Sequence, residues 1–249
     1  MSKRDSAALA PGVFGKGSVA VQGLPALETL LYGEDAAAEL RAAGDEAAYR
    51  CALVRAITAN LRAMAQGLYE EWTGGDDPYG KLLDRAGPEE LRFRHAREVT
   101  VELFKSLHTA IELVADHKLA RPLGTAVQSA RPRLAESWRS RRSLDNIRRN
   151  LAAAQAMYGG ENGAGGMSGF VRGLAGDAAL DDLMKRAFTQ TLATANGIKV
   201  PLEEGAGKAP SRAAFDKLAR EARALKTLLV QRLAPALAIP VGFNQLDGD

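Results

Sequence analysis

A single acidic residue, Glu28, lies in the otherwise apolar segment between Gly23 and Gly33. The spacing of the leucines predicts a short helix, on which residues three or four apart share a face. Pro25, Glu28 and Tyr32 then line one side of this helix. The carboxylate of Glu28 is either a hard oxygen ligand for a metal ion or a structural carboxylate paired with an arginine. The adjacent apolar stripe consists of Leu24, Leu27 and Leu31.

Seven arginines gather between residues 131 and 149, with Trp138 as the only aromatic residue near them. They are Arg131, Arg133, Arg139, Arg141, Arg142, Arg148 and Arg149. Guanidinium groups bind carboxylates and phosphates through paired hydrogen bonds, so the cluster favours binding of a small anion. A solvated basic face, with Arg139 or Arg142 turned inward, is the alternative. A basic stripe alone is weak evidence for nucleic acid, and we expect no such partner.

Oxygen-bearing side chains also gather at the end of the sequence, where Asn244, Asp247 and Asp249 follow Phe243. Such oxygens are typical ligands of hard cations. They are equally suited to pairing with arginines if the tail docks on the fold with Phe243 as its anchor. Because chain termini are ordered only when they are tied down, we favour structural docking.

A His-x-x-Glu pattern occurs once, at His95 and Glu98, where we expect a histidine in the core or at its boundary. Other catalytic patterns are missing from the sequence. There is no Glu-x-x-His pair on two helices, no His-Glu-x-x-His zinc helix and no Gly-x-Ser-x-Gly elbow. The sequence therefore favours binding over catalysis.

The composition sets further limits. The 249 residues include 33 Lys and Arg against 30 Asp and Glu, a net charge of only +3, and a single cysteine, which excludes an intrachain disulfide. No apolar run is long enough to span a membrane, and the first residues do not form a secretory signal.

Nearly all of the sequence has helical periodicity, and strand-like alternation is almost absent, which predicts an all-α fold of antiparallel helical bundles. We expect long helices over about 45–73, 88–120, 144–154, 180–196 and 211–233. A glycine-rich loop is expected at 159–169. The predicted boundary between two domains lies near residue 87. Residues 88–249 contain enough helices for a complete four-helix bundle, whereas residues 1–87 contain too few to bury their apolar stripes alone.

Three of these segments, in the same order, resemble the imelysin family. The family's signature helix reads Gly-x-His-x-x-Glu before an aliphatic pair, an aromatic residue and Gly, and residues 23–33 match it except that Pro25 replaces the histidine. The segment 136–147 and the C-terminal segment 242–249 are similar to two further family segments. The resemblance implies two helical bundles with a shared site between them. On this basis residues 1–87 are a remnant of the first bundle that has lost its N-terminal helices, packed on the complete second bundle.

The resemblance also implies which residues bind the ligand. They are Gly23, Pro25, Glu28, Tyr32, Trp138, Arg139, Arg142, Asn244 and Asp247, with Glu28 as the one candidate metal ligand. Proline has no donor atom, so half of the family's His and Glu pair is lost. Family members are typically exported to the periplasm or anchored as lipoproteins at the cell envelope, and they include iron-regulated proteins.

The preferred interpretation is a non-catalytic protein of the bacterial envelope. It binds a small anion or a metal ion, iron or another divalent metal, and is linked to iron acquisition, with other iron-uptake components as possible partners. Two alternatives stay open: a metallopeptidase, the activity for which the imelysin family is named, and a structural or interaction protein that has lost the metal site.

Overall fold

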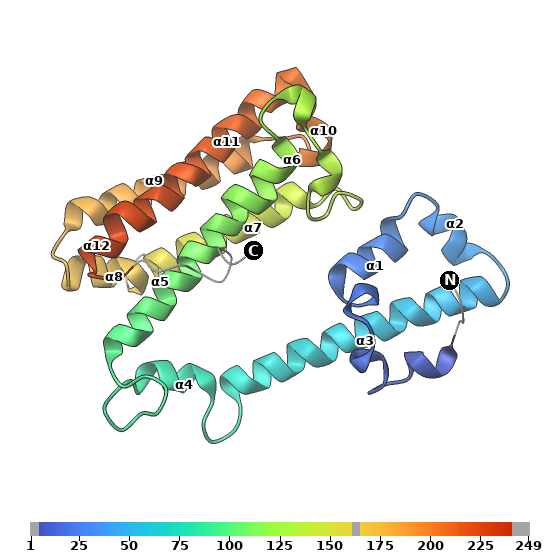
Figure 1. The fold of residues 1–249 in the computed structure, drawn as a ribbon, viewed down its shortest axis with the longest axis horizontal. Helices are drawn as coiled ribbons and strands as arrows, with labels where there is room; N and C mark the ends of the chain where they lie inside the picture. The colour runs from blue at the N-terminus through green and yellow to red at the C-terminus, as the bar shows by residue number, and fades with distance from the viewer. Residues whose placement is uncertain (1–4, 161–164, 241–249) are drawn as a thin grey trace. The chain divides into compact units, whose positions relative to one another are not determined.

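The computed structural model describes residues 5–160 and 165–240, and every regular element in these residues is a helix. The chain divides into two compact units, Met1–Phe93 and Arg94–Asp249, each of which is described by itself. Figure 1 labels their helices. The predicted all-α fold of helical bundles is confirmed. None of the helices in the described part is long and apolar enough to cross a membrane.

The first unit is built around one long helix, α3 (Asp45–Thr73), whose bounds agree with the prediction. Two shorter helices, α1 (Gly23–Tyr32) and α2 (Ala36–Arg41), pack on its first half (Figure 1). Ile57 is fully buried there. Three 3₁₀ turns precede α1, at Ser6–Leu9, Phe14–Lys16 and Val19–Val21.

The second half of α3 is more exposed than its sequence pattern predicts. Met64 and Leu68 belong to the predicted apolar stripe, yet they are 63% and 58% exposed. Near its end, the rings of Trp72 and Tyr79 meet edge to face with their centroids 4.9 Å apart. Tyr79 begins α4 (Tyr79–Asp84), so this contact closes the turn between the two helices.

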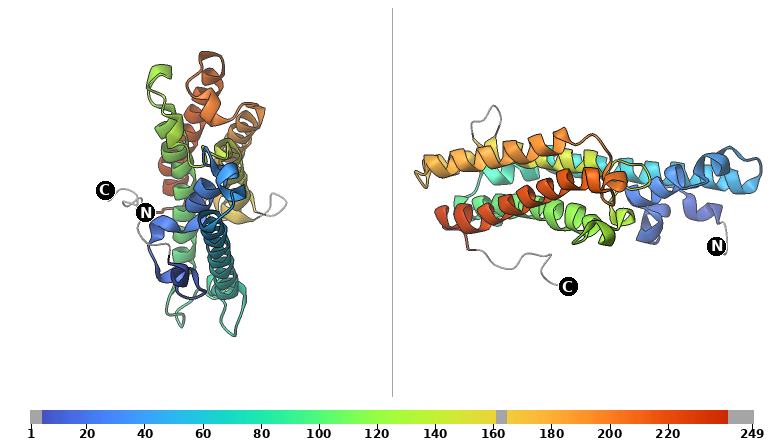
Figure 2. Two further views of the ribbon diagram at one scale, coloured as in Figure 1. Left: turned by 90° about the vertical axis from the view of Figure 1, so that its right-hand side faces the viewer. Right: turned by 90° about the horizontal axis from the view of Figure 1, so that it is seen from above.

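The second unit is a four-helix bundle. Its long helices are α5 (Ala96–Glu112), α7 (Ser143–Gly159), α9 (Ala178–Gly197) and α11 (Ala209–Leu228). They run alternately up and down, and each packs against two others, as the views in Figures 1 and 2 show. The bundle seam on α11 is buried as predicted, at Phe215, Leu218, Ala222, Leu225 and Leu229.

Shorter elements lie between the long helices or, in the case of α12, after the last of them. These are α6 (Arg121–Leu123), α8 (Gly166–Gly173), α10 (Leu202–Gly205) and α12 (Ala234–Ala236), with 3₁₀ turns at Val127–Ser129 and Pro132–Leu134. Two π-helical stretches, Leu113–Ala120 and Leu229–Leu233, extend α5 and α11. The predicted loop at 159–169 is wrong in part, because α8 begins at Gly166.

The bounds predicted for the first bundle helix are wrong at both ends. It begins at Ala96, after His95, and not near residue 88. His95 is exposed, and its backbone N–H donates to the Glu98 carboxylate at 3.3 Å. The His-x-x-Glu pattern is therefore a helix start and not part of the core.

At its other end the same helical run continues through Pro122 to Leu123. In an α-helix a proline ring clashes with the carbonyl group four residues earlier. The wider π turn before Pro122 reduces this clash, so the helical run can pass through the proline. Gly124 then ends the run with φ at +61°, and a Cβ on this residue would lie 2.5 Å from the Ser129 carbonyl oxygen. Only glycine fits both constraints.

One buried arginine holds the loops at this end of the bundle. Arg212, on α11, is 4% exposed. Its Nη1 donates to the carbonyl oxygens of Leu123 and Ala206, at 2.8 and 3.1 Å. Nη1 also donates to the Ala126 carbonyl oxygen, at 3.2 Å. Nη2 donates to the Gly124 carbonyl oxygen at 3.2 Å, and Nε donates to the Asp216 carboxylate at 2.7 Å. The planar fork of five donors thus joins the end of α6 to the end of α10.

A buried carboxylate joins the helices elsewhere in the bundle. Asp181, on α9, is fully buried and accepts from the Tyr158 hydroxyl of α7 at 3.0 Å and from Lys185 at 3.0 Å. Arg172, on α8, donates to the same carboxylate. Burial raises the pKa of Asp181, but hydrogen bonds from Ser168, Arg172, Lys185 and Tyr158 together lower this pKa to about 2. The site is fully hydrogen-bonded and structural.

We predict that Arg212→Lys lowers the free energy of unfolding by about 2 kcal/mol, because an ammonium group cannot reach five acceptors and leaves buried carbonyls unpaired. Urea unfolding followed by circular dichroism measures the change. Arg220→Lys, on the exposed face of the same helix, is the control and should stay within about 0.5 kcal/mol of the original chain. Equal stability of the two variants would contradict the role given to Arg212.

A second prediction concerns pH. The pKa of Asp181 is about 2 in the folded chain, below the value of about 3.9 that is usual for an unfolded chain. Its contribution to stability is therefore complete above about pH 5 and is lost as the pH falls through 2. The stability difference between the original chain and Asp181→Asn should be constant from pH 5 to 7 and should narrow from pH 4 to 2. Asp182→Asn, at an exposed neighbour, is the control. A difference that stays constant down to pH 2 would refute the assignment.

Candidate functional site

The arginine-rich segment forms an ordered turn between α6 and α7. The carbonyl oxygen of Ser137 accepts from the Arg142 N–H at 3.1 Å and from the Ser140 hydroxyl at 3.3 Å. The Ser137 N–H donates in turn to the Ser143 hydroxyl at 3.3 Å. These bonds fix the backbone on both sides of Trp138, which is half-buried.

Two guanidinium groups lie against the ring of Trp138. The centre of the Arg139 guanidinium is 4.3 Å from the ring centroid, and that of Arg133 is 5.3 Å away. A cation within about 6 Å of an indole face is attracted by the ring quadrupole. Trp138 thereby holds two positive charges close together, although their mutual repulsion opposes this arrangement.

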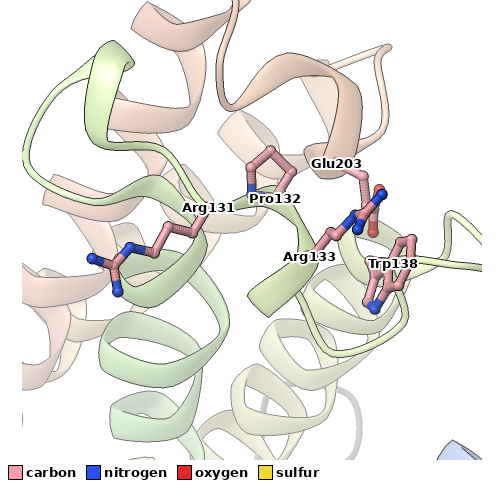
Figure 3. A pocket seen from close by; sticks show the side chains of 5 residues that line it. All are labelled: Arg131, Pro132, Arg133, Trp138 and Glu203. Atoms are coloured by element: carbon pink, nitrogen blue, oxygen red, sulfur yellow. The ribbon is translucent and has the colours of Figure 1, made fainter.

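A pocket of about 470 Å³ opens beside this stack. Figure 3 shows the five residues that line it: Arg131, Pro132, Arg133, Trp138 and Glu203. Arg133, Trp138 and Glu203 lie together on one side of Pro132, whereas the Arg131 side chain extends on the other side. The pocket combines positive charge, an aromatic face and one carboxylate.

Ion pairing separates the arginines of the segment into two groups. Arg142 and Arg148 both pair with Asp145, at 2.7 and 2.9 Å, and Arg141 pairs with Glu204. The hydrogen bond from Arg142 is the main cause that lowers the pKa of Asp145, and burial opposes it.

The second group consists of Arg131, Arg133, Arg139 and Arg149, which form no ion pair with any residue that the structure describes. The first three surround the pocket or stack on its tryptophan. Three of the four arginines without an ion pair are therefore at the pocket or on its tryptophan, and Arg149, on α7, is the fourth.

Glu203 brings a carboxylate to the pocket from α10. Its Oε1 accepts from the hydroxyl of Ser143 and from the Ser143 N–H, the latter at 3.3 Å. Its Oε2 is buried and has no hydrogen-bond partner. Sequence reasoning missed Glu203, because it lies 60 residues from Ser143 and no spacing pattern links them.

The predicted signature helix is α1, and its described environment differs from the expected buried stripe. Pro25 and Tyr32 are exposed and Glu28 is half-buried. Leu24, expected in the apolar stripe, is 69% exposed. Within its own unit α1 packs mainly on α2, α3 and the 3₁₀ turn at Val19–Val21, which leave part of its surface uncovered.

The residues present on α1 do not fit a metal ion. Pro25 supplies no donor atom, and one carboxylate is fewer than the three protein ligands typical of a catalytic zinc site. Within residues 5–160 and 165–240 there is no group of three or more His, Cys, Asp or Glu side chains that could hold a metal ion. The metal role of Glu28 stays a prediction.

The structure thus brings together Trp138 and Arg139 of the predicted site residues and places Arg142 in the same turn. Gly23, Pro25, Glu28 and Tyr32 share α1, in the other unit, so the predicted site between two domains stays a prediction. Asn244 and Asp247 lie outside the described residues.

A family model for imelysin matches residues 1–229. This chain belongs to the imelysin family. Its fold is similar to that of an imelysin peptidase from Bacteroides ovatus, with 22% identity over 72% of this chain and 51% of that chain, and a TM-score of 0.58. It is also similar to a protein described as an iron-regulated protein A precursor from Parabacteroides distasonis, with 16% identity over 90% of this chain and 70% of that chain, and a TM-score of 0.68.

No curated protein matches this imelysin-family chain. The chain spans about half the length of the Bacteroides protein. At these identities the two likenesses show the fold alone.

The missing histidine gives a testable prediction. Pro25→His places an imidazole three residues before Glu28 on one helix face, and the affinity for Zn²⁺ should rise about tenfold or more, as measured by calorimetric titration. Pro25→Ala is the matched control and should show no gain. If Glu28 is the second ligand, the double variant Pro25→His and Glu28→Ala loses the gain; a gain that persists there would exclude Glu28 as a ligand.

Proposed function

We propose that this imelysin-family chain is a non-catalytic binding protein that takes a small anion in the pocket beside Trp138. The observation that carries the proposal is the division of the arginines into two groups. Arg141, Arg142 and Arg148 have carboxylate partners, whereas Arg131, Arg133 and Arg139, which line the pocket or stack on its tryptophan, have none in the described structure. Unpaired guanidinium groups around a concave, partly apolar surface are typical of sites for carboxylates and phosphates.

The energetics favour binding at this place over other parts of the basic surface. A hydrogen bond to a charged group contributes about 1.5–3 kcal/mol, and a planar guanidinium can make two such bonds to one carboxylate. The Trp138 ring restrains Arg133 and Arg139 before the anion arrives, so less side-chain entropy is lost on binding. An anion between these groups also removes the repulsion between them.

A metal ion is the less favoured ligand. Glu28 is the one candidate that the sequence offers, and the described residues around it do not complete a set of ligands. The anion site uses Trp138 and Arg139, which the sequence also selects, and adds Arg131, Arg133 and Glu203.

The wider setting is part of the proposal. One protein of similar fold is described as an iron-regulated protein A precursor. This description supports a role in iron acquisition, in which other iron-uptake components are the partners. The same likeness and the family resemblance support a location in the periplasm or cell envelope.

Peptidase activity is the main alternative, because another protein of similar fold is described as an imelysin peptidase. Such a reaction needs a metal with an open coordination position and a group that activates water. Hydrolysis of peptides by the purified chain, abolished by a chelator, would overturn the non-catalytic assignment.

Calorimetric titration with phosphate, succinate and citrate tests the anion site. We expect one or more of these anions to bind with a stoichiometry of one. The double variant Arg133→Gln and Arg139→Gln should weaken binding by about tenfold or more, because each lost charge-assisted hydrogen bond exceeds 1.4 kcal/mol.

The matched control is the double variant Arg148→Gln and Arg149→Gln, which removes the same net charge on α7. It should change the affinity by less than about threefold, a long-range charge effect that added salt screens. Equal losses in the two double variants, or no binding of any of the three anions, would contradict the proposed site.

A further inference from the structure

The geometry points to Glu203 as a specificity-determining residue that selects anions carrying a hydrogen-bond donor next to the carboxylate, namely hydroxy acids and amino acids. This inference rests on the anion site proposed above and names the chemical class of its ligand. Its basis is that Glu203 lines the pocket and that the buried Oε2 atom of the same side chain has no hydrogen-bond partner.

The two oxygens of this carboxylate have different environments. Oε1 is held by the hydroxyl and the N–H of Ser143, at the start of α7. These bonds fix the rotation of the carboxylate, so Oε2 cannot turn to Ser143 without breaking them. Because α10 is packed against the turn at Pro132–Leu134, the backbone also gives Glu203 little freedom to withdraw.

No neighbouring side chain satisfies Oε2. Arg133 lies on the same side of Pro132 as Glu203 in Figure 3, yet no ion pair joins the two residues, and the Arg133 guanidinium lies over the Trp138 ring instead. The adjacent Glu204 takes Arg141 as its partner. A buried carboxylate oxygen without a donor is costly, and such atoms are rare in folded proteins.

A ligand that supplies the missing donor removes this cost. An acid with only carboxylate groups would satisfy the guanidinium groups, but its negative charge would lie beside Glu203 and the two carboxylates would repel each other. A ligand with a hydroxyl or an ammonium group beside its carboxylate gives the arginines an anion and gives Oε2 a donor. A volume of about 470 Å³ is ample for such a molecule.

Three acids of the same length separate these cases. Succinate has no donor at its second carbon, malate has a hydroxyl there and aspartate has an ammonium group. We expect calorimetric titration of the original chain to show malate and aspartate binding at least about tenfold more tightly than succinate, which corresponds to one well-placed hydrogen bond.

The variant Glu203→Gln changes this order without a change of shape. Its amide oxygen can still accept from Ser143, which turns the NH₂ group, a donor, toward the pocket. Aspartate, whose ammonium group only donates, should then fall to the affinity of succinate or below. Malate should lose less, because its hydroxyl can accept as well as donate.

Glu204→Gln is the matched control, because it removes the same charge from the adjacent residue, whose partner is Arg141, and leaves Glu203 and Ser143 as they are. The order of the three acids should persist in this variant, and thermal unfolding followed by circular dichroism shows whether each variant is folded.

The order of affinities and the arginine variants distinguish two kinds of failure. If the acids bind equally in the original chain, or if Glu203→Gln leaves their order unchanged, the selective role of Glu203 is wrong although the anion site stands. If phosphate or citrate binds but none of these three acids does, the role of Glu203 is wrong and the anion site stands; if none of the anions binds, the anion site is wrong and the role of Glu203 with it.

Discussion

The guanidinium of Arg212 is the interaction on which the pocket depends. It lies on α11, far in sequence from the arginine segment, and it gathers carbonyl oxygens from the end of α6 and from Ala206 directly after α10. The first group leads into Arg131 and Pro132, and α10 carries Glu203. A single buried fork therefore sets the distance between the basic and the acidic walls of the pocket. A buried charge of this kind is tolerated because each of its three nitrogens donates to an acceptor.

The arginines of the second unit show that local sequence does not decide what a charge does. Arg141 and Arg142 lie only two and three residues after Arg139, yet they pair with Glu204 and Asp145, whereas Arg139 lies on an indole ring. The difference comes from the turn between Ser137 and Ser143, which directs successive side chains to different surroundings. The same turn connects through Ser143 to Glu203, so the order of the backbone and the chemistry of the pocket have a common origin.

Much of the fold is predictable from the sequence, since long helices have strong periodicity and clear ends. The limits of α3 follow from Asp45 at its start and the Gly and Asp residues after Thr73, and the seam on α11 follows from its apolar spacing. The start of α5 and the passage through Pro122 are not predictable in this way. The first depends on a cap made by His95 and Glu98, and the second on a π turn, which has no simple sequence signal. For the site, Trp138 and Arg139 carry a sequence signal, whereas Glu203 reaches the pocket only through the tertiary packing of α10.

The chain has two tryptophans, Trp72 in an edge-to-face contact with Tyr79 and Trp138 in contact with two guanidinium groups. One belongs to each compact unit. Replacing either with phenylalanine yields a protein whose intrinsic fluorescence reports on one unit alone. The two tryptophans are thus separate optical probes of the two units. Comparing the melting curves of the two single-tryptophan variants reveals whether the units unfold in one cooperative transition or in succession.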